Sequence, residues 1–263
     1  MSGFEYYEFQ AIDRKLTKEE INKIGALSSR SRVNRNRAVF TYNYGSFRGN
    51  TQELLLNHFD AFLYTSNFGT KELSFRIPAS LFNAKALCLY EYEYAVEVET
   101  YGDSTIINLQ FNDDEAGGWV EEEDCLNLLD DMLPIRESLI KGDPRALYLT
   151  LLAHKDGIES DDEADEERGD YLQSLPIPPN LKNLDAALET LVAFFEIPGD
   201  VLQEVAQKSP DISAPSLDSA KILALLSKIP AQEKDAYLLR VLEGDAHVAI
   251  ELNKKLQEKA LSF

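Results

Sequence analysis

The side chains that most often carry acid–base or metal chemistry are few and scattered in this 263-residue chain. Its three histidines, His58, His154 and His247, lie far apart in the sequence. An imidazole acts as a base or a metal ligand together with other groups held beside it. No His-Glu-x-x-His, Gly-x-Ser-x-Gly or Cys–His pattern accompanies these histidines. We therefore expect structural or surface roles for them and predict no catalytic residue.

Carboxylates are abundant, and a cluster of them is a candidate for a cation site or a catalytic pair. They gather at residues 121–124 and at Asp130 and Asp131, without the Asp-x-Asp-x-Asp-Gly pattern of calcium-binding loops. Acids at the start of a predicted helix complement its dipole, which is the simpler interpretation. The glycine-bearing loops 45–49 and 67–69 match no phosphate-binding pattern. The sequence thus predicts no metal site and no cofactor.

A basic segment, residues 28–37, is the clearest candidate for a binding surface. Alternate residues of an extended strand project to one side, and guanidinium groups bind carboxylates and phosphates through paired hydrogen bonds. We expect this segment to contact either the acids of this chain or an acidic partner, and we favour both over nucleic acid. The candidate partner-binding residues are Arg30, Arg32, Arg35, Arg37 and Arg48.

The charge of the chain is strongly negative and unevenly distributed. The formal net charge is −20, and residues 111–170 hold 20 Asp and Glu against five Lys and Arg, a net of −15. The densest run, residues 159–170, cannot bury apolar surface and is typical of a solvated linker. A protein this acidic repels phosphate backbones, so direct nucleic-acid binding is not expected.

The elements that would position these residues change in type along the chain. Alternating apolar and polar residues indicate strands in the N-terminal part, and apolar residues at helical spacing indicate helices. Strands are expected at residues 4–12, 38–44, 71–77 and in a hairpin over 92–111 that turns at Gly102 and Asp103; helices are expected at 18–28, 52–62, 79–82, 124–140 and 143–153. The sequence predicts an α+β fold, a mostly antiparallel sheet of about five strands with helices.

Beyond the acidic run, the pattern becomes entirely helical. Helices are expected at residues 184–195, 199–208, 217–227, 231–243 and 246–260. The short connections between them favour a C-terminal all-α bundle. We therefore predict an α+β domain over residues 1–156, an acidic and then proline-rich linker over 157–180, and a helical bundle domain over 181–263.

Cysteine use and hydropathy indicate the compartment. The two cysteines, Cys88 and Cys125, show no Cys-x-x-Cys spacing, which favours reduced thiols over a disulfide or a metal site. The first residues lack the basic and apolar regions of a signal peptide, and no apolar run is long enough to span a bilayer. We expect a cytoplasmic protein that does not bind membranes.

Several stretches resemble an uncharacterised family of acidic bacterial proteins that begin with a segment of the YYEFQAID type. The stretches are residues 6–13, 59–64 with 67–69, 145–149 and 233–241. The resemblance implies a bacterial cytosolic protein in which the N-terminal and C-terminal regions occur together. It implies no activity and no functional residue.

These observations favour a non-catalytic protein-binding adaptor or regulatory subunit of a bacterial complex, with a partner protein from the same operon. One alternative is an accessory factor of a phage-defence or CRISPR-linked operon, in which residues 111–170 imitate nucleic acid. A second alternative is an enzyme with an unrecognised active site. A deep pocket holding His58, Asp60 and an arginine would favour this last hypothesis.

Overall fold

A computed structural model describes most of the chain as two compact units. The described residues are 3–112, 120–154, 171–211, 219–242, 248, 251–252 and 255–256. The first unit spans Met1–Pro210 and the second Asp211–Phe263. Each unit is described by itself below.

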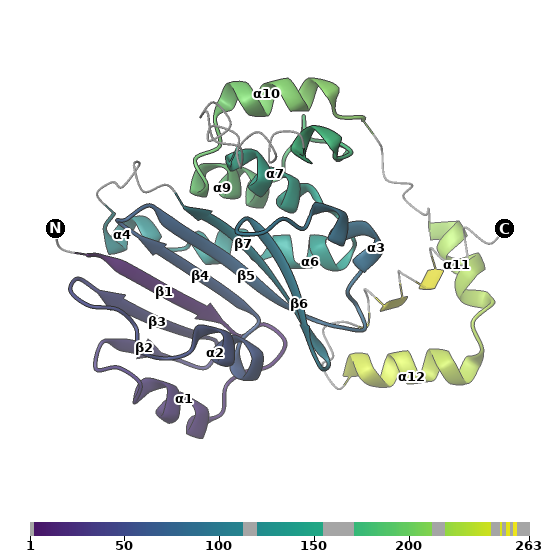
Figure 1. Ribbon diagram of the computed structural model, residues 1–263. Helices are drawn as coiled ribbons and strands as arrows, with labels where there is room; N and C mark the ends of the chain where they lie inside the picture. The colour runs from purple at the N-terminus through teal and green to yellow at the C-terminus, as the bar shows by residue number, and fades with distance from the viewer. Residues whose placement is uncertain are drawn as a thin grey trace. The chain divides into compact units, whose positions relative to one another are not determined.

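The first unit is built on one antiparallel sheet of seven strands in the order β2-β3-β1-β4-β5-β7-β6 (Figure 1). The strands are β1 Glu5–Gln10, β2 Ser31–Val33, β3 Arg37–Tyr42, β4 Ala61–Ser66, β5 Thr70–Pro78, β6 Val96–Tyr101 and β7 Ser104–Asn112. The predicted α+β class with an antiparallel sheet is confirmed. Two strands, β2 and β4, are additional to the expected five.

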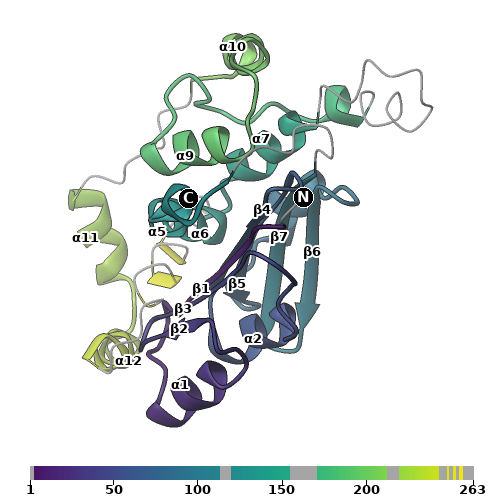
Figure 2. The ribbon, with the colours of Figure 1, turned by 90° about the vertical axis from the view of Figure 1, so that its left-hand side faces the viewer.

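Helices of the first unit cover both faces of this sheet, as Figure 2 shows. They are α1 Lys18–Gly25, α2 Thr51–His58, α3 Ala84–Leu87, the 3-10 helix η1 Cys88–Tyr90, α4 Glu122–Cys125, α5 Leu128–Met132, α6 Pro134–Ile140, α7 Arg145–Ala153, α9 Ala186–Phe194 and α10 Gly199–Lys208. We call the face covered by α1 and α2 the first face. The second face packs against α5, α6 and α7.

An aromatic cluster fills the first face over β3, β1 and β4. The alternation of β1 places Tyr7 and Phe9 on this face, where the Phe9 and Phe62 ring centroids lie 4.6 Å apart. Leu54 and Leu55 of α2 pack on the same cluster. A capping box is present at the start of α1, where Thr17 and Glu20 exchange hydrogen bonds, and it fixes where that helix begins.

The expected helix over residues 124–140 is three short helices, α4, α5 and α6. Asn127, between α4 and α5, has a φ of 67°, which no helical residue adopts. Pro134 lacks a backbone N–H and begins α6 at the N-terminal position that suits proline. The expected helix over 79–82 is a turn, and α3 follows it at Ala84.

The first compact unit continues beyond the segment where we placed the linker. Helix α9 packs against α5, α6 and α7, and Phe195 lies 6.2 Å from the Phe111 ring at the end of β7. The division between the units falls after Pro210, later than the expected linker over 157–180, because α9 and α10 bury apolar side chains within the first unit. Residues 155–170, which include the acidic run, lie outside the described residues.

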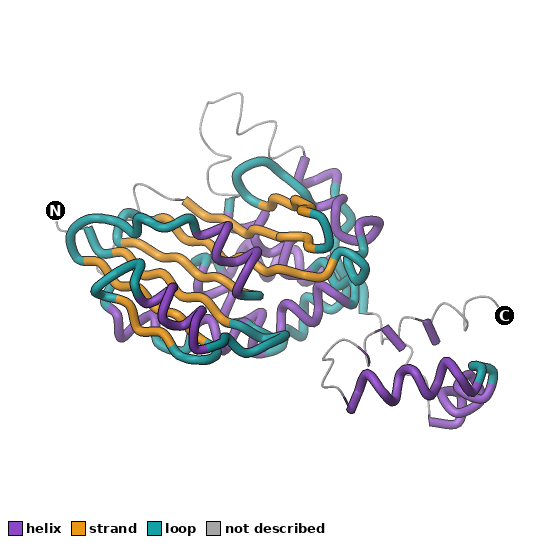
Figure 3. Tube along the Cα trace, turned by 90° about the horizontal axis from the view of Figure 1, so that it is seen from below, coloured by secondary structure: helices purple, strands orange, loops and turns teal. Residues whose placement is uncertain are grey.

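The regular secondary structure that is described in the second unit consists of helices, and Figure 3 distinguishes them from the strands of the sheet. It contains α11 Ser219–Ser227 and α12 Ala231–Leu242. A small core of Leu225, Ile229 and Leu256 holds it together, and Arg240 pairs with Glu251 at 2.7 Å. Among the described helices of both units, none has the length and hydropathy needed to cross a membrane.

Candidate functional site

The first face of the sheet becomes polar where α2 stops covering it. In β5, alternation places Leu73 and Phe75 on the second face and Glu72 and Ser74 on the first. The register then sets polar residues beside them on β7 and β6: Gln110 lies opposite Glu72, Asn108 opposite Ser74, and Glu97 opposite Asn108. A strip of carboxylates, amides and one hydroxyl therefore runs along this half of the sheet.

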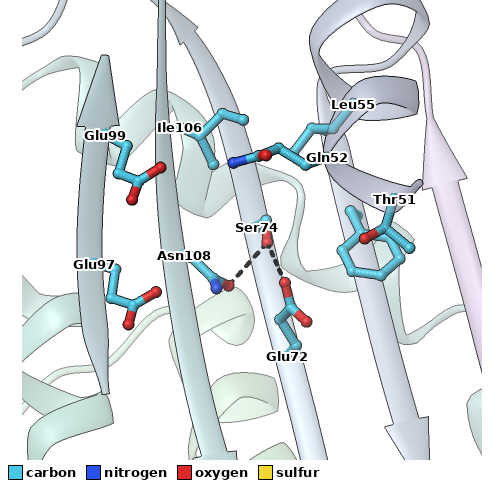
Figure 4. Close-up of a pocket in the computed structure, with 10 residues that line it drawn as sticks. Thr51, Gln52, Leu55, Glu72, Ser74, Glu97, Glu99, Ile106 and Asn108 are labelled. Carbon is cyan, nitrogen blue, oxygen red and sulfur yellow. Dashed lines mark hydrogen bonds between the residues drawn. The ribbon is translucent and has the colours of Figure 1, made fainter. Parts of the chain in front are cut away.

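A cavity of about 140 Å³ lies between this strip and the start of α2 (Figure 4). Three carboxylates, four other polar side chains and three apolar side chains line it. These are Glu72, Glu97, Glu99, Gln52, Ser74, Asn108, Thr51, Leu55, Phe62 and Ile106. The cavity is smaller than the roughly 300–1,000 Å³ typical of pockets for whole small molecules, so its size suits a single side chain or a small amine.

Neutral donors hold the three carboxylates in place. The Ser74 hydroxyl lies 3.0 Å from Glu72 Oε1 and 2.9 Å from Asn108 Oδ1, the two contacts dashed in Figure 4. Gln110 Nε2 donates to Glu97 Oε2 at 3.0 Å.

A third donor is the Tyr101 hydroxyl, which donates to Glu99. It accepts in turn from Gln52 Nε2 at 2.6 Å, so the carboxylate of Glu99 is tied to α2 through a tyrosine. All three carboxylates are thus oriented before any ligand arrives, which lowers the entropic cost of binding one.

The negative charge of the cavity has no counter-charge within the described part of the chain. No lysine, arginine or histidine described there forms an ion pair with Glu72, Glu97 or Glu99. Burial, with a smaller contribution from the charge of Glu97, raises the pKa of Glu72 to about 6, although the Ser74 hydrogen bond opposes this shift. Over the described residues, no group of three or more His, Cys, Asp and Glu side chains is placed to hold a metal ion.

Two of the five predicted binding arginines form ion pairs with acids of this chain. Arg32 pairs with Glu122, and Arg37 lies 3.4 Å from Asp130 and 2.8 Å from the fully buried Glu8. Glu122 and Asp130 both belong to the acidic segment 111–170, so the internal-pairing interpretation holds for these two arginines. Arg32 and Arg37 also line one shallow cavity of about 450 Å³ on the second face.

The other three predicted arginines lie apart from that cavity. Arg30 lies over the Tyr42 ring, with its guanidinium carbon 5.5 Å from the ring centroid. Arg35 and Arg48 are exposed and form no ion pair with a described residue. The structure therefore does not gather the five arginines into one site.

The residues named for an unrecognised active site have structural partners. His58 Nδ1 lies 3.1 Å from Glu20 Oε1 at the start of α1. Asp60 is 1% exposed and pairs with Arg76, while its second oxygen accepts from the backbone N–H groups of Ile12 and Asp13 at 2.6 and 2.9 Å. Asp60 thus joins β4, β5 and the loop after β1, and its lone pairs are engaged in that joint.

The remaining histidines and the cysteines add no second cluster among the described residues. His154 Nε2 lies 2.8 Å from the backbone oxygen of Gln110, and His247 lies outside the described residues. Both cysteines are free; Cys88 is exposed, and Cys125 is buried, which raises its pKa to about 12. A thiol with so high a pKa is a poor nucleophile.

Sequence reasoning missed the acidic cavity, although part of its signal was visible. Glu97 and Glu99 alternate with valines in the predicted hairpin, which already assigned them to one face. The pairing of β5 with β7 brings Glu72 and Ser74 beside them, and this pairing joins strands that are not neighbours in the sequence.

Comparison with known proteins identifies no functional site, so the candidate site is chosen from the geometry alone. No protein-family model matches the chain, and no curated protein and no solved structure matches it. The resemblance to acidic bacterial proteins stays an expectation from the sequence. The three carboxylates of the cavity, which form no ion pair with any residue that the structure describes, therefore constitute the candidate functional site.

Proposed function

We propose that this protein is a non-catalytic protein-binding module, an adaptor or regulatory subunit, which holds a basic side chain of a partner protein in the acidic cavity. The observation that supports this proposal is the convergence of Glu72, Glu97 and Glu99 on one cavity without a cation among the described residues. Because like charges held together are unfavourable, an arriving ammonium or guanidinium group relieves their repulsion.

The cavity lining matches a lysine or arginine side chain along its whole length. Such a side chain packs its methylene groups on apolar surface while its charged end reaches polar groups. Leu55, Phe62 and Ile106 offer that apolar surface, and the carboxylates offer the acceptors. The net charge of −20 adds long-range attraction for a basic partner and raises its association rate.

A second contact surface is proposed on the C-terminal unit, which we infer to be an all-helical bundle. Five large apolar side chains there are more than half exposed, which is unusual for a surface without a partner. They are Leu223, Leu238, Leu239, Val241 and Leu242, at 55–85% exposed. The partner is expected from the same operon. The nucleic-acid-mimic alternative stays a prediction, because residues 159–170 lie outside the described residues.

The test is a titration of the ¹⁵N-labelled protein, followed by NMR, with Nα-acetyl-lysine methylamide as the probe. Nα-acetyl-norleucine methylamide has the same alkyl chain without the charge and serves as the control ligand. Only the lysine derivative is expected to bind, and the shifted amides should map to the start of α2 and to β5, β6 and β7. Binding should weaken as salt is added, because the attraction is electrostatic.

The matched protein variants are Glu97→Gln in the cavity and Glu93→Gln, an exposed glutamate outside its lining. Loss of one charge-assisted hydrogen bond, about 1.5–3 kcal/mol, weakens binding by at least about tenfold in Glu97→Gln. Glu93→Gln should leave the dissociation constant unchanged. Equal binding of lysine and norleucine derivatives, or equal effects of the two variants, would refute the proposed function.

A further inference from the structure

The strand beside the cavity, β6, is the last strand of the sheet, and some backbone groups on its outer edge form no hydrogen bond with a described residue. Tyr101 and Ser104 flank the two-residue turn, so they form a hydrogen-bonded pair and the pairs alternate from there. The backbone contacts of two residue pairs agree with this alternation: Gln110 N–H donates to Ala95 O at 2.8 Å, and Val96 exchanges bonds of 2.9 and 2.8 Å with Tyr92 on the outer side.

The same alternation turns the N–H and C=O groups of Val98 and Thr100 outward. The Tyr92 bonds satisfy Val96, but no backbone bond to a described residue involves the outward groups of Val98 or Thr100. Glu97 and Glu99, the intervening residues, direct their side chains to the first face beside the cavity (Figure 4). Two backbone positions that no described residue pairs with thus lie next to two cavity carboxylates.

We propose that an extended segment of the partner adds to β6 as an eighth strand and places a lysine or arginine, one of several at alternate positions, in the acidic cavity. This inference rests on the proposed function and specifies how the partner binds. Side chains of an added strand that face the first face would lie directly beside Glu97 and Glu99, where opposite charges stabilise cross-strand pairs.

The negative charge of the β6 edge disfavours a second copy of this chain as the added strand. Proteins protect edge strands with charged side chains, and the two glutamates repel a second copy of the same edge. The opposite edge of the sheet, β2, carries Arg32, which already pairs with Glu122. A basic segment of another protein fits the β6 edge better than either edge of a second copy.

The test measures binding of the full chain to a fluorescein-labelled peptide, Val-Lys-Val-Lys-Val-Lys-Val, by fluorescence anisotropy. In antiparallel addition, the valines lie opposite Val98 and Thr100, so valine N–H groups bond to β6 and lysine N–H groups face away. Methylating the valine nitrogens should weaken binding by about tenfold or more, the loss of roughly one net hydrogen bond per blocked site. Methylating the backbone nitrogens of the lysines instead should have little effect, because these N–H groups face away from β6. The valine-methylated and lysine-methylated peptides carry the same charge, so charge cannot explain a difference between them.

A pair of protein variants tests the same contact from the other side. Thr100→Pro removes an outward N–H, and proline is tolerated on an edge strand at such a position. Thr100→Val keeps the N–H and the shape. We expect about tenfold weaker binding for Thr100→Pro and an unchanged dissociation constant for Thr100→Val. Should Thr100→Pro fail to fold by circular dichroism, the two methylated peptides still decide the outcome.

The outcomes separate this inference from the proposed function. One outcome would be that both methylated peptides bind the natural chain, and the unmethylated peptide binds Thr100→Pro, as tightly as the unmethylated peptide binds the natural chain. If Glu97→Gln still weakens binding in that case, strand addition is wrong and the proposed binding of a basic side chain stands. If Glu97→Gln has no effect, the proposed function is wrong. A peptide that does not bind the intact chain refutes both, and a concentration-dependent dimer blocked by Thr100→Pro would assign the edge to a second copy.

Discussion

Replacing Glu72 with glutamine should make the protein more stable at neutral pH, although Glu72 is one of the three carboxylates of the candidate site. Glutamine resembles a protonated carboxyl in shape, and its Oε1 can still accept from the Ser74 hydroxyl that lies 3.0 Å from Glu72 Oε1. The variant therefore removes a charge from the cavity and little else.

The magnitude follows from the pKa of Glu72, which burial raises from 4.5 to about 6. Because the pKa is higher in the folded state, the folded protein holds this proton more tightly than the unfolded chain. The contribution of Glu72 to stability is therefore greatest below pH 4.5 and is lost as the pH rises through 6. This rise in pKa corresponds to a cost of about 2 kcal/mol when the carboxylate is ionised. Glu72→Gln removes that cost.

The assay is urea unfolding followed by far-UV circular dichroism at a series of pH values. At pH 8, Glu72→Gln should gain about 2 kcal/mol in the free energy of unfolding, which is roughly 4–8 °C in Tm for a unit of this size. At pH 5 the gain should fall to less than half of that value. The exposed control Glu93→Gln should stay within about 0.5 kcal/mol of the natural chain at both pH values. A gain that does not depend on pH, or a loss of stability at pH 8, would refute the reasoning.

Two further predictions concern the joints of the first unit. Arg136 is 5% exposed and donates to both oxygens of Asp13 at 2.9 and 2.8 Å, so Arg136→Ala should cost about 3–5 kcal/mol in urea unfolding by breaking a largely buried ion pair. The exposed pair of Arg32 makes Arg32→Ala the control, at less than about 1 kcal/mol, and equal losses would contradict this account. Gly142 has a φ of +82°, and a Cβ there would lie 2.8 Å from Asn83 Nδ2, so Gly142→Ala should lower Tm. Gly199→Ala, with no atom within 4 Å of its new Cβ, should not, and an unchanged Tm in Gly142→Ala would show that the loop relaxes.

The N-terminal sheet was predictable in kind because its strands alternate clearly, whereas its strand count was not. Strand β4 follows α2 after only Phe59 and Asp60, and the apolar run there suits a helix as well as a strand. The boundary is decided by tertiary contacts: Phe59 is extended, with φ −128° and ψ 168°, and Asp60 is fixed by Arg76. A single sequence does not reveal that Asp60 and Arg76 form an ion pair.

The subdivision of the expected helix over 124–140, in contrast, could have been predicted from the sequence, because it contains a helix-breaking residue. Pro134 breaks a helix because it has no N–H, and it was present in the sequence. The candidate site lies between these extremes. Alternation in the hairpin assigned Glu97 and Glu99 to one face, but only the long-range register of β5 with β7 adds Glu72 and creates the cavity.

The central place of β1 has a consequence for how the chain is made. Because β1 pairs with β3 on one side and β4 on the other, it cannot be fully hydrogen-bonded until residues up to Ser66 have been synthesised. At about 5–20 residues per second, that delay is on the order of 3–11 s. During it, Tyr6, Tyr7 and Phe9 belong to an aromatic-rich strand with at least one unpaired edge, which is the kind of segment that aggregates. The nascent chain is therefore most vulnerable before its fourth strand emerges, and slow translation of residues 11–60 would lengthen that exposure.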